Sequence, residues 1–329
     1  MRHILRMIFY AMYFSFVISF VACPSPTGGR KSSDQNIMLT EEKWLEILHD
    51  IAEKNEMVDL DLSAYLRSES NEGGGLRSDG TFDPMQNGIS IASEGKAKIR
   101  SLILPDAATA IIGKDPTVFS QFDSLKTVTG RNITQIGSFA FGFNPPNYLV
   151  LESVDFPNAI YIGKAAFMNN RLTQAHFPLV TVIGDNAFNG CDLLESAYFP
   201  EAVTVEMFAF ADCIILENIY MPKAEEIGRV AFAIFIPGNN AKMSPETNIT
   251  LGKEAPKLDV GIFDVFNTDR SVIVNVPEGA TGYGNSVSGT NSTVCWGNGL
   301  RGPGWNGAAF TGNPLNINPR ISVSIVEKP

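Results

Sequence analysis

The chain has 329 residues, a formal net charge of −10 at pH 7 and 44% hydrophobic residues. This apolar content predicts a fully folded protein rather than a disordered one. The acidic balance, without a basic patch, argues against nucleic acid and anionic lipid as partners.

The first 22 residues have the features of a cleaved export signal. Arg2 and Arg6 form a basic head, and residues 7–22 contain no charged side chain. This run is shorter than the roughly 20 residues that a membrane-spanning helix needs, so it predicts a signal peptide rather than a transmembrane helix. Removing residues 1–22, which hold two Arg and no acidic residue, changes the formal charge from −10 to −12.

The signal ends at Phe20-Val21-Ala22-Cys23, a phrase that resembles the bacterial lipobox. In that motif the cysteine is acylated and becomes the mature N-terminus, so Cys23 is the expected site of lipid attachment. The alternative is an ordinary secretory signal with an incidental Cys23. Residues 23–39 begin with a run rich in Pro, Gly and Ser, which predicts a flexible tether behind the lipid.

The remaining cysteines do not form a disulfide framework. They are three, an odd number, which excludes complete pairing in an exported chain: Cys191, Cys213 and Cys295. The fold must therefore be held by packing.

Residues 40–98 are expected to form a separate N-terminal region. Thr40 is a candidate N-cap for a helix whose apolar residues have helical spacing: Trp44, Leu45, Leu48 and Ile51. The alternation of Val58, Leu60 and Leu62 then predicts a strand. Residues 67–97 are rich in Gly, Ser and Asp, and this composition predicts a loop or linker.

Two interleaved phrases recur through the middle of the chain. The first, of the form Ile-Gly-x-x-Ala-Phe, begins at Ile136, Ile162, Ile183, Val205 and Ile227, and its closing Phe residues are 26, 21, 22 and 22 positions apart. The second, Leu-x-x-apolar-x-apolar-Pro-x-small, begins at Leu151, Leu172, Leu194 and Leu216. A unit of about 22 residues cannot bury its own apolar side, so the units must stack into a solenoid with one continuous core.

Each unit is expected to hold one short strand, closed by its proline, and an Ala-Phe pair on the opposite wall in a short helical turn. Degenerate copies begin at Ile99, Leu125, Ile249 and Val272, which places the repeats at 99–248 and a C-terminal cap region at 249–329. The longer first interval predicts a loop at residues 142–147. Glu206 replaces the usual Gly, and a different bend is expected there.

These phrases resemble the BspA-like leucine-rich repeat, and the flanks resemble spirochaete lipoproteins of that type. The flanking matches are residues 58–63 and 101–107 before the repeats, and residues 276–284 with Trp296-Gly297 after them. The resemblance implies a leucine-rich-repeat solenoid of short strands and irregular or short helical turns. It also implies a small N-terminal α+β region, a β-rich C-terminal cap, and a role in cell-surface adhesion or host-protein binding, without naming a ligand.

No constellation for catalysis is present, so we predict no enzyme activity, no cofactor and no metal site. The two histidines of the mature chain, His49 and His176, lie on unlike elements, and no nucleophile-elbow, zincin or P-loop motif occurs. Cys191 and Cys213 are one repeat apart, which predicts a buried ladder of small residues, with a metal pair or disulfide as the alternative. Residues 79–83 have some likeness to a calcium loop but lack its full ligand spacing.

A binding surface is predicted on the outward positions of the strands, which superpose at about 4.8 Å from repeat to repeat. One column holds Asp155, His176, Tyr198 and Tyr220, and its neighbour holds Ser153, Gln174, Ser196 and Asn218. Rows of aromatic and polar side chains on an open sheet suit the binding of proteins. The alternative is a solvated surface on which these residues only make favourable cross-strand contacts.

The resulting prediction is a cell-surface lipoprotein that binds other proteins, either host extracellular matrix or other cell-surface proteins. It would be held in the bacterial envelope, in the outer membrane, by its N-terminal lipid, on the surface or the periplasmic side. The alternative function is an envelope scaffold or lipoprotein-assembly partner with no host ligand.

Overall fold

A computed structural model describes residues 37–84, 90–113, 118–119, 121–142, 151–234, 246–258, 270–281, 287–290 and 320–328, all within one compact unit. The export signal, Cys23, most of the expected tether, the loop from residue 143 onward, Trp296 and Cys295 lie outside this range. In the described part of the chain, no helix has both the length and the apolar character to cross a bilayer.

The first helix of the described range, α2 (Glu41–Ala52), has the N-terminus and the buried side that its sequence predicts. The Lys43 backbone N–H donates to the Thr40 hydroxyl oxygen over 3.2 Å, which makes Thr40 the N-cap. Trp44, Leu48 and Ile51 are buried. Strand β1 (Val58–Asp61) follows and pairs in parallel with β4 (Ile99–Ile103).

The predicted linker at residues 67–97 is wrong, because this segment contains β2 (Gly75–Leu76), β3 (Thr81–Asp83) and helix α3 (Ser90–Ala97). Two of its glycines are required by this structure. Gly80 adopts a φ of +87° in the β2–β3 hairpin. A Cβ on Gly95 would lie 2.1 Å from the Leu48 carbonyl oxygen, so α3 packs onto α2 only because residue 95 has no side chain.

The end of the predicted tether also belongs to the folded unit. Leu39 is fully buried, and its backbone N–H donates to the Leu66 carbonyl over 2.9 Å. Met38 forms a parallel bridge with Leu66. The folded part therefore begins no later than residue 37.

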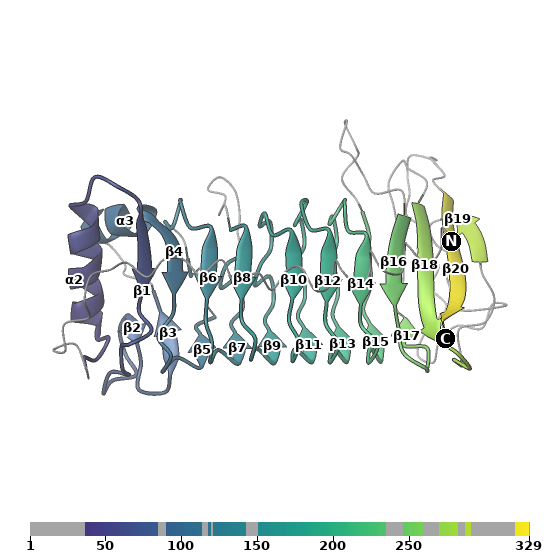
Figure 1. Ribbon diagram of the computed structural model, residues 1–329, viewed down its shortest axis with the longest axis horizontal. Helices are drawn as coiled ribbons and strands as arrows, with labels where there is room; N and C mark the ends of the chain where they lie inside the picture. Colours follow the sequence, from purple (N-terminus) through teal and green to yellow (C-terminus); the bar gives the residue numbers. More distant parts are fainter. Residues whose placement is uncertain are drawn as a thin grey trace, which may run out of the picture. The chain divides into compact units, whose positions relative to one another are not determined.

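The repeats form the predicted solenoid, with two short parallel strands in each turn (Figure 1). The first row, after β4, contains β6 (Thr127–Thr129), β8 (Ser153–Asp155), β10 (Gln174–His176), β12 (Ser196–Tyr198), β14 (Asn218–Tyr220) and β16 (Glu246–Thr250). The second row contains β5 (Ala110–Ile111), β7 (Gln135–Ile136), β9 (Tyr161–Ile162), β11 (Val182–Ile183), β13 (Thr204–Val205), β15 (Glu226–Ile227) and β17 (Lys257–Leu258).

The two rows differ in continuity. The seven strands of the second row belong to one nine-stranded sheet that also includes β2 and β3. The first row is divided into a four-stranded sheet that ends at β8 and a seven-stranded sheet that begins at β10. The strand pairing is therefore uninterrupted along the nine-stranded sheet and broken once in the first row, between β8 and β10.

On the third side of each turn, where the sequence predicts a short helical turn, the described residues form hydrogen-bonded turns that do not extend into a helix. The residue before the Ala-Phe pair lies in the left-handed region in every unit, at Phe139, Ala165, Asn186, Phe208 and Val230, with φ between 50° and 58°. Its backbone N–H points along the solenoid to the next repeat, as from Ala165 to the Asp185 carbonyl over 2.7 Å. The N–H of Phe167 does the same to Ala187 over 2.8 Å. Because these donors bond between repeats, the segment closes only single turns within itself, such as the 3.2 Å bond from the Ala166 N–H to the Gly163 carbonyl.

Glu206 does not introduce the bend that was expected. Its carboxylate accepts a hydrogen bond from the Asp185 backbone N–H over 2.9 Å. Strand β13, which precedes it, stays in register with both β11 and β15. The acidic side chain thus joins two repeats instead of disturbing their stacking.

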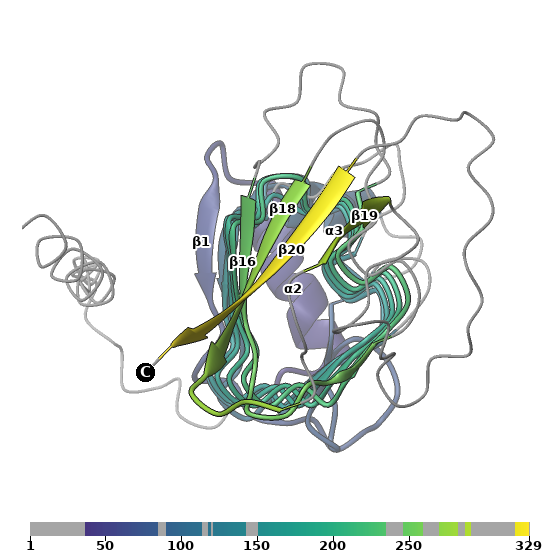
Figure 2. The ribbon, with the colours of Figure 1, turned by 90° about the vertical axis from the view of Figure 1, so that its right-hand side faces the viewer.

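Figure 2 shows the turns of the solenoid end on, one behind another. Their core is built on columns of stacked phenylalanine rings. One column has ring centroids 5.1 to 5.4 Å apart and nearly parallel planes, and contains Phe141, Phe167, Phe188, Phe210 and Phe232. A second column brings Phe177 and Phe199 to 5.4 Å. These stacks bury the aromatic residue of each repeat against its neighbours on both sides.

The last strands extend the seven-stranded sheet: β18 (Arg270–Pro277), β19 (Val287–Thr290) and β20 (Arg320–Lys328). The alternation that begins at Val272 correctly predicts β18. Strand β20 was missed, although Ile321, Val323 and Ile325 alternate in the same way. It pairs in parallel with β18 and antiparallel with β19.

Candidate binding face

The outward columns have the predicted register on three strands. His176 pairs with Tyr198 and Tyr198 with Tyr220, and the neighbouring column pairs Gln174, Ser196 and Asn218. The central residues of the same strands, Ala175, Ala197 and Ile219, are buried. Since side chains alternate along a strand, both flanking columns point away from the core. We call the surface of β10, β12 and β14 formed by these six outward residues the aromatic face.

The three rings of the aromatic face form a continuous stack. The His176 and Tyr198 centroids are 4.9 Å apart with planes 7° from parallel, and those of Tyr198 and Tyr220 are 5.1 Å apart at 8°. The rings cover one another's faces, and Tyr220 remains 38% exposed. The stack therefore presents ring edges and the Tyr220 hydroxyl to a partner.

Two of the eight predicted residues lie on a different sheet. Asp155 and Ser153 are on β8, where they pair with Thr129 and Thr127 of β6. Strands β8 and β10 are not joined in one sheet, so Asp155 does not continue the column of His176 through a hydrogen-bonded register. The break lies between β8 and β10, whose first residues are 21 positions apart, whereas the longer interval separates β6 and β8, which do pair, so the repeat spacing does not reveal it.

The structure adds residues to the face that the sequence analysis did not select. Asn248 and Thr250 of β16 continue the two columns beyond Asn218 and Tyr220. The alternation of Ile249 and Leu251 was the available signal, because it places their neighbours outward.

Acidic side chains border the aromatic face where β12 and β14 begin, and two ion pairs lie at or next to the separate four-stranded sheet. Glu195 and Glu217 are exposed, precede β12 and β14, and are joined by a 3.0 Å backbone hydrogen bond. Near β1 and β6, by contrast, Arg100 forms an ion pair with Asp59 and Lys126 with Glu152. The hydrogen bond from Arg100 also holds the pKa of Asp59 below its ordinary value.

Cys191 and Cys213 are free, buried and donate hydrogen bonds to the backbone. Their thiols lie 3.1 Å and 3.2 Å from the carbonyl oxygens of Phe167 and Phe188. Asn170 occupies the equivalent position one repeat earlier, and its amide donates to the Phe141 carbonyl over 2.8 Å. The predicted buried ladder is correct. In each of these three repeats, its side chain also donates a hydrogen bond to a backbone carbonyl.

We expect both thiols to resist alkylation in the folded protein. Burial raises the pKa of Cys191 to about 12, so almost no thiolate exists near neutral pH. Mass-spectrometric mapping of iodoacetamide adducts should find Cys191 and Cys213 modified at least about 100-fold more slowly in native than in guanidine-unfolded protein. Equal rates in the two states would contradict the burial of this ladder.

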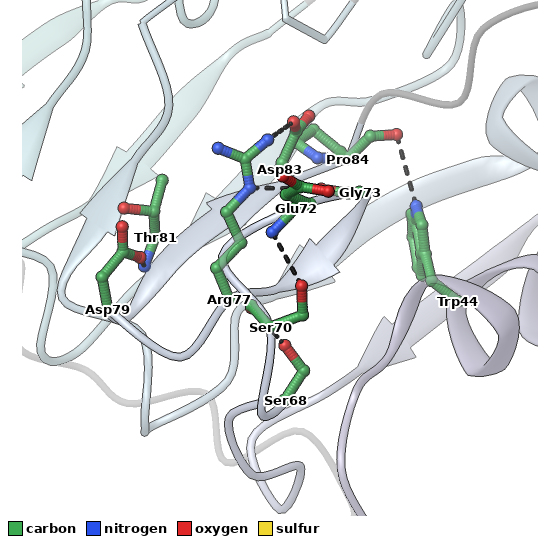
Figure 3. A network of polar contacts seen from close by, with 10 residues as sticks. All are labelled: Trp44, Ser68, Ser70, Glu72, Gly73, Arg77, Asp79, Thr81, Asp83 and Pro84. Atoms are coloured by element: carbon green, nitrogen blue, oxygen red, sulfur yellow. Dashed lines mark hydrogen bonds and ion pairs between the residues drawn. The ribbon is translucent and has the colours of Figure 1, made fainter.

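The segment with some likeness to a calcium loop is committed to internal contacts (Figure 3). Asp83 is 3% exposed and accepts a hydrogen bond from Arg77 over 2.6 Å, while the Asp79 carboxylate accepts from the Thr81 backbone N–H over 2.8 Å. The Trp44 indole donates to the Pro84 carbonyl over 3.3 Å. Among the described residues, no group of three or more His, Cys, Asp or Glu side chains is placed to hold a metal ion.

His49 does not approach His176, consistent with their prediction on unlike elements. It lies in the last turn of α2, half exposed, 3.6 Å from the Glu53 carboxylate. The described residues thus offer an extended surface for contacts rather than a convergent titratable site.

The parallel two-strand turns, the stacked core and the open outer columns define a repeat solenoid of the leucine-rich class. Residues 115–235 match the family described as BspA type leucine rich repeat region, in six copies. The repeats of this chain belong to that family.

One solved structure found by comparison is that of a leucine rich cell surface protein from Faecalibacterium prausnitzii A2-165. It is 18% identical over 56% of this chain and 74% of that chain, with a TM-score of 0.24. No curated protein matches the sequence significantly.

Proposed function

We propose that this protein is a cell-surface lipoprotein that binds other proteins through the aromatic face. The observation that carries the proposal is the stack of His176, Tyr198 and Tyr220 on an outer sheet surface, in register over three repeats. Protein interfaces are enriched in tyrosine, and most of their binding energy comes from a few aromatic or Arg residues.

The stack is also suited to binding for an entropic reason. Each ring is held by its neighbours at 4.9 to 5.1 Å, so it has little rotamer freedom left to lose when a partner arrives. The adjacent column supplies amide and hydroxyl groups from Gln174, Ser196 and Asn218 for hydrogen bonds. Rigid aromatic edges beside adaptable polar groups favour a protein surface over a small molecule, which would require a pocket.

The binding test uses the purified protein against a panel of immobilised extracellular matrix proteins. Exchange of both Tyr198 and Tyr220 for Ala should weaken binding to a matrix protein recognised by the wild type by at least about 30-fold, since aromatic hot spots contribute about 2 kcal/mol or more each. Tyr161→Ala is the matched control, because Tyr161 is similarly exposed but lies on β9 in the other sheet. Unchanged binding by the double variant, or an equal loss in the control, would refute the aromatic face as the binding surface.

The lipid anchor and the surface location form a separate part of the proposal. They are supported by the basic head, the uncharged run and the phrase that ends at Cys23. Added protease should digest the protein on intact cells while a periplasmic marker survives, and Cys23→Ser should release the protein from the membrane fraction. Protection until the envelope is opened would favour the envelope scaffold instead.

A further inference from the structure

Large hydrophobic side chains also gather on the other sheet of the solenoid, the nine-stranded one. Four of them are exposed: Ile160 by 47%, Leu179 by 44%, Tyr161 by 40% and Met207 by 37%. They lie on three consecutive repeats, at or next to β9, β11 and β13. Single exposed hydrophobic residues are ordinary, but a group of them marks an interaction surface.

Backbone pairing aligns Ile160 and Tyr161 with the half-buried Val182 and Val203 across three repeats. Tyr161 is in register with Val182, and Val182 with Thr204. One position earlier, the Thr181 N–H donates to the Ile160 carbonyl and the Val203 N–H to the Thr181 carbonyl, each over 2.8 Å. We define the β9–β13 patch as the apolar residues that this pairing aligns: Ile160, Tyr161, Val182 and Val203.

The charges around the patch are largely neutralised within the chain. Arg131 lies 3.4 Å from Asp106 on one side, Lys223 lies 2.5 Å from Glu201 on the other, and Lys257 lies 3.2 Å from Glu226 beyond it. Beside the aromatic face, Glu195 and Glu217 are exposed acidic neighbours on adjacent repeats. The patch is therefore apolar at its centre and nearly balanced in charge at its rim.

We propose that the β9–β13 patch is a self-association surface that binds a second copy of this chain. A chain with a formal charge of −10 repels its own copies, so two copies can meet only where the local charge is balanced. The β9–β13 patch meets this condition, and the more acidic surroundings of the aromatic face do not. The two sides of the solenoid thus have different partners: another protein on the first row, and a second copy on the nine-stranded sheet.

The charge pattern also selects the orientation of the two copies. The exposed Glu225 lies at the C-terminal edge of the patch, whereas the uncharged Thr134 and Gln135 lie at its N-terminal edge. A two-fold axis near Val182 places Glu225 against the uncharged edge of the partner, and Tyr161 opposite the partner's Thr204. A parallel arrangement would place Glu225 against its own copy. The antiparallel, isologous dimer is therefore favoured.

The patch covers only three repeats, less than the roughly 800 Å² per partner of a standard interface, so the dimer should be weak. Sedimentation equilibrium of the purified protein should show a reversible dimer with a dissociation constant between about 1 and 100 µM. A protein that remains monomeric up to about 1 mM would overturn the proposal.

Two exposed tyrosines on different sheets provide a matched pair of variants. Tyr161→Lys should weaken the dimer by at least about tenfold, because it brings an amine onto the apolar centre, whereas Tyr220→Lys should leave it unchanged. Near-ultraviolet circular dichroism confirms that both variants are folded. Loss of the dimer in the Tyr220 variant with retention in the Tyr161 variant would assign self-association to the aromatic face and overturn the proposal.

A crosslink tests the two-fold axis directly. In a Cys295→Ser background, Val182→Cys should form a disulfide-linked dimer under mild oxidation, because each new thiol faces its equivalent. Thr250→Cys, on the aromatic side, should remain monomeric. Equal crosslinking of both variants would contradict the assignment.

Matrix binding depends on Tyr198 and Tyr220, whereas dimerisation depends on Tyr161. Failure of the binding proposal is therefore distinguishable from failure of the dimer proposal.

Discussion

Phe188→Ala is expected to lower the free energy of unfolding by about 3–5 kcal/mol, the range for truncating a fully buried phenylalanine. Phe188 is 0% exposed and lies between Phe167 at 5.2 Å and Phe210 at 5.1 Å, in nearly parallel stacks. It also contacts Phe177 and Phe199 of the second column at 6.0 and 5.8 Å. Neighbouring rings held by their own repeats cannot collapse into the vacated volume.

Urea denaturation followed by far-ultraviolet circular dichroism measures this loss. Because repeats contact only their neighbours, the variant should also show a lower m-value or a second transition, as the two halves of the solenoid begin to unfold separately. Leu179→Ala is the control, since Leu179 is 44% exposed and should change stability by less than about 0.5 kcal/mol. An effect below about 1 kcal/mol for Phe188→Ala would contradict the stacked core.

Lys96→Met is expected to stabilise the protein at neutral pH by up to about 3 kcal/mol. Lys96 is 2% exposed, and its ammonium lies 5.9 Å from the Phe122 ring centroid. Desolvation lowers the pKa of Lys96 to about 8, against a smaller opposing effect of the Asp83 carboxylate. Asp83 is already paired with Arg77, so removal of Lys96 does not leave that carboxylate without a cation.

The direction of the Lys96 pKa shift determines how the stability difference between Lys96→Met and the wild type changes with pH. Between pH 8 and the ordinary lysine pKa of 10.5, the unfolded chain binds the proton that the folded chain releases, so stability rises with pH across that window. The stability advantage of Lys96→Met should be constant below about pH 8 and shrink towards zero as the pH approaches 10.5. Lys54→Met, at an exposed position after α2, is the control and should show no such trend. An advantage that does not vary with pH would show that the burial of charge is not its cause.

The repeat architecture could be predicted from the sequence because its determinants are periodic. A phrase repeated every 22 residues specifies that equivalent positions stack, and the alternation within each unit specifies which residues face the core. The register of His176, Tyr198 and Tyr220, the buried cysteine ladder and the Thr40 cap of α2 all follow from such local rules. Each depends on spacing within one unit or between adjacent units.

Features that depend on contacts between distant segments could not be predicted in this way. Strand β3 exists because it pairs with β5, and α3 approaches α2 through Gly95, so a composition typical of a linker was misleading for residues 67–97. The left-handed residues before the Ala-Phe pairs are stabilised by hydrogen bonds to carbonyls of the next repeat. Helix propensity describes one segment by itself, so it does not take these bonds into account.

The two candidate surfaces also combine features that the sequence predicts with features that only the tertiary structure reveals. The sequence alone determined which side chains point outward, because the strand period is two. Only the tertiary structure decided that Asp155 belongs to a separate sheet from His176, and that Ile160 and Val203 of different repeats lie in one apolar patch. The physical reason is that pairing between turns depends on the backbone geometry of both turns together, whereas periodicity describes each turn by itself.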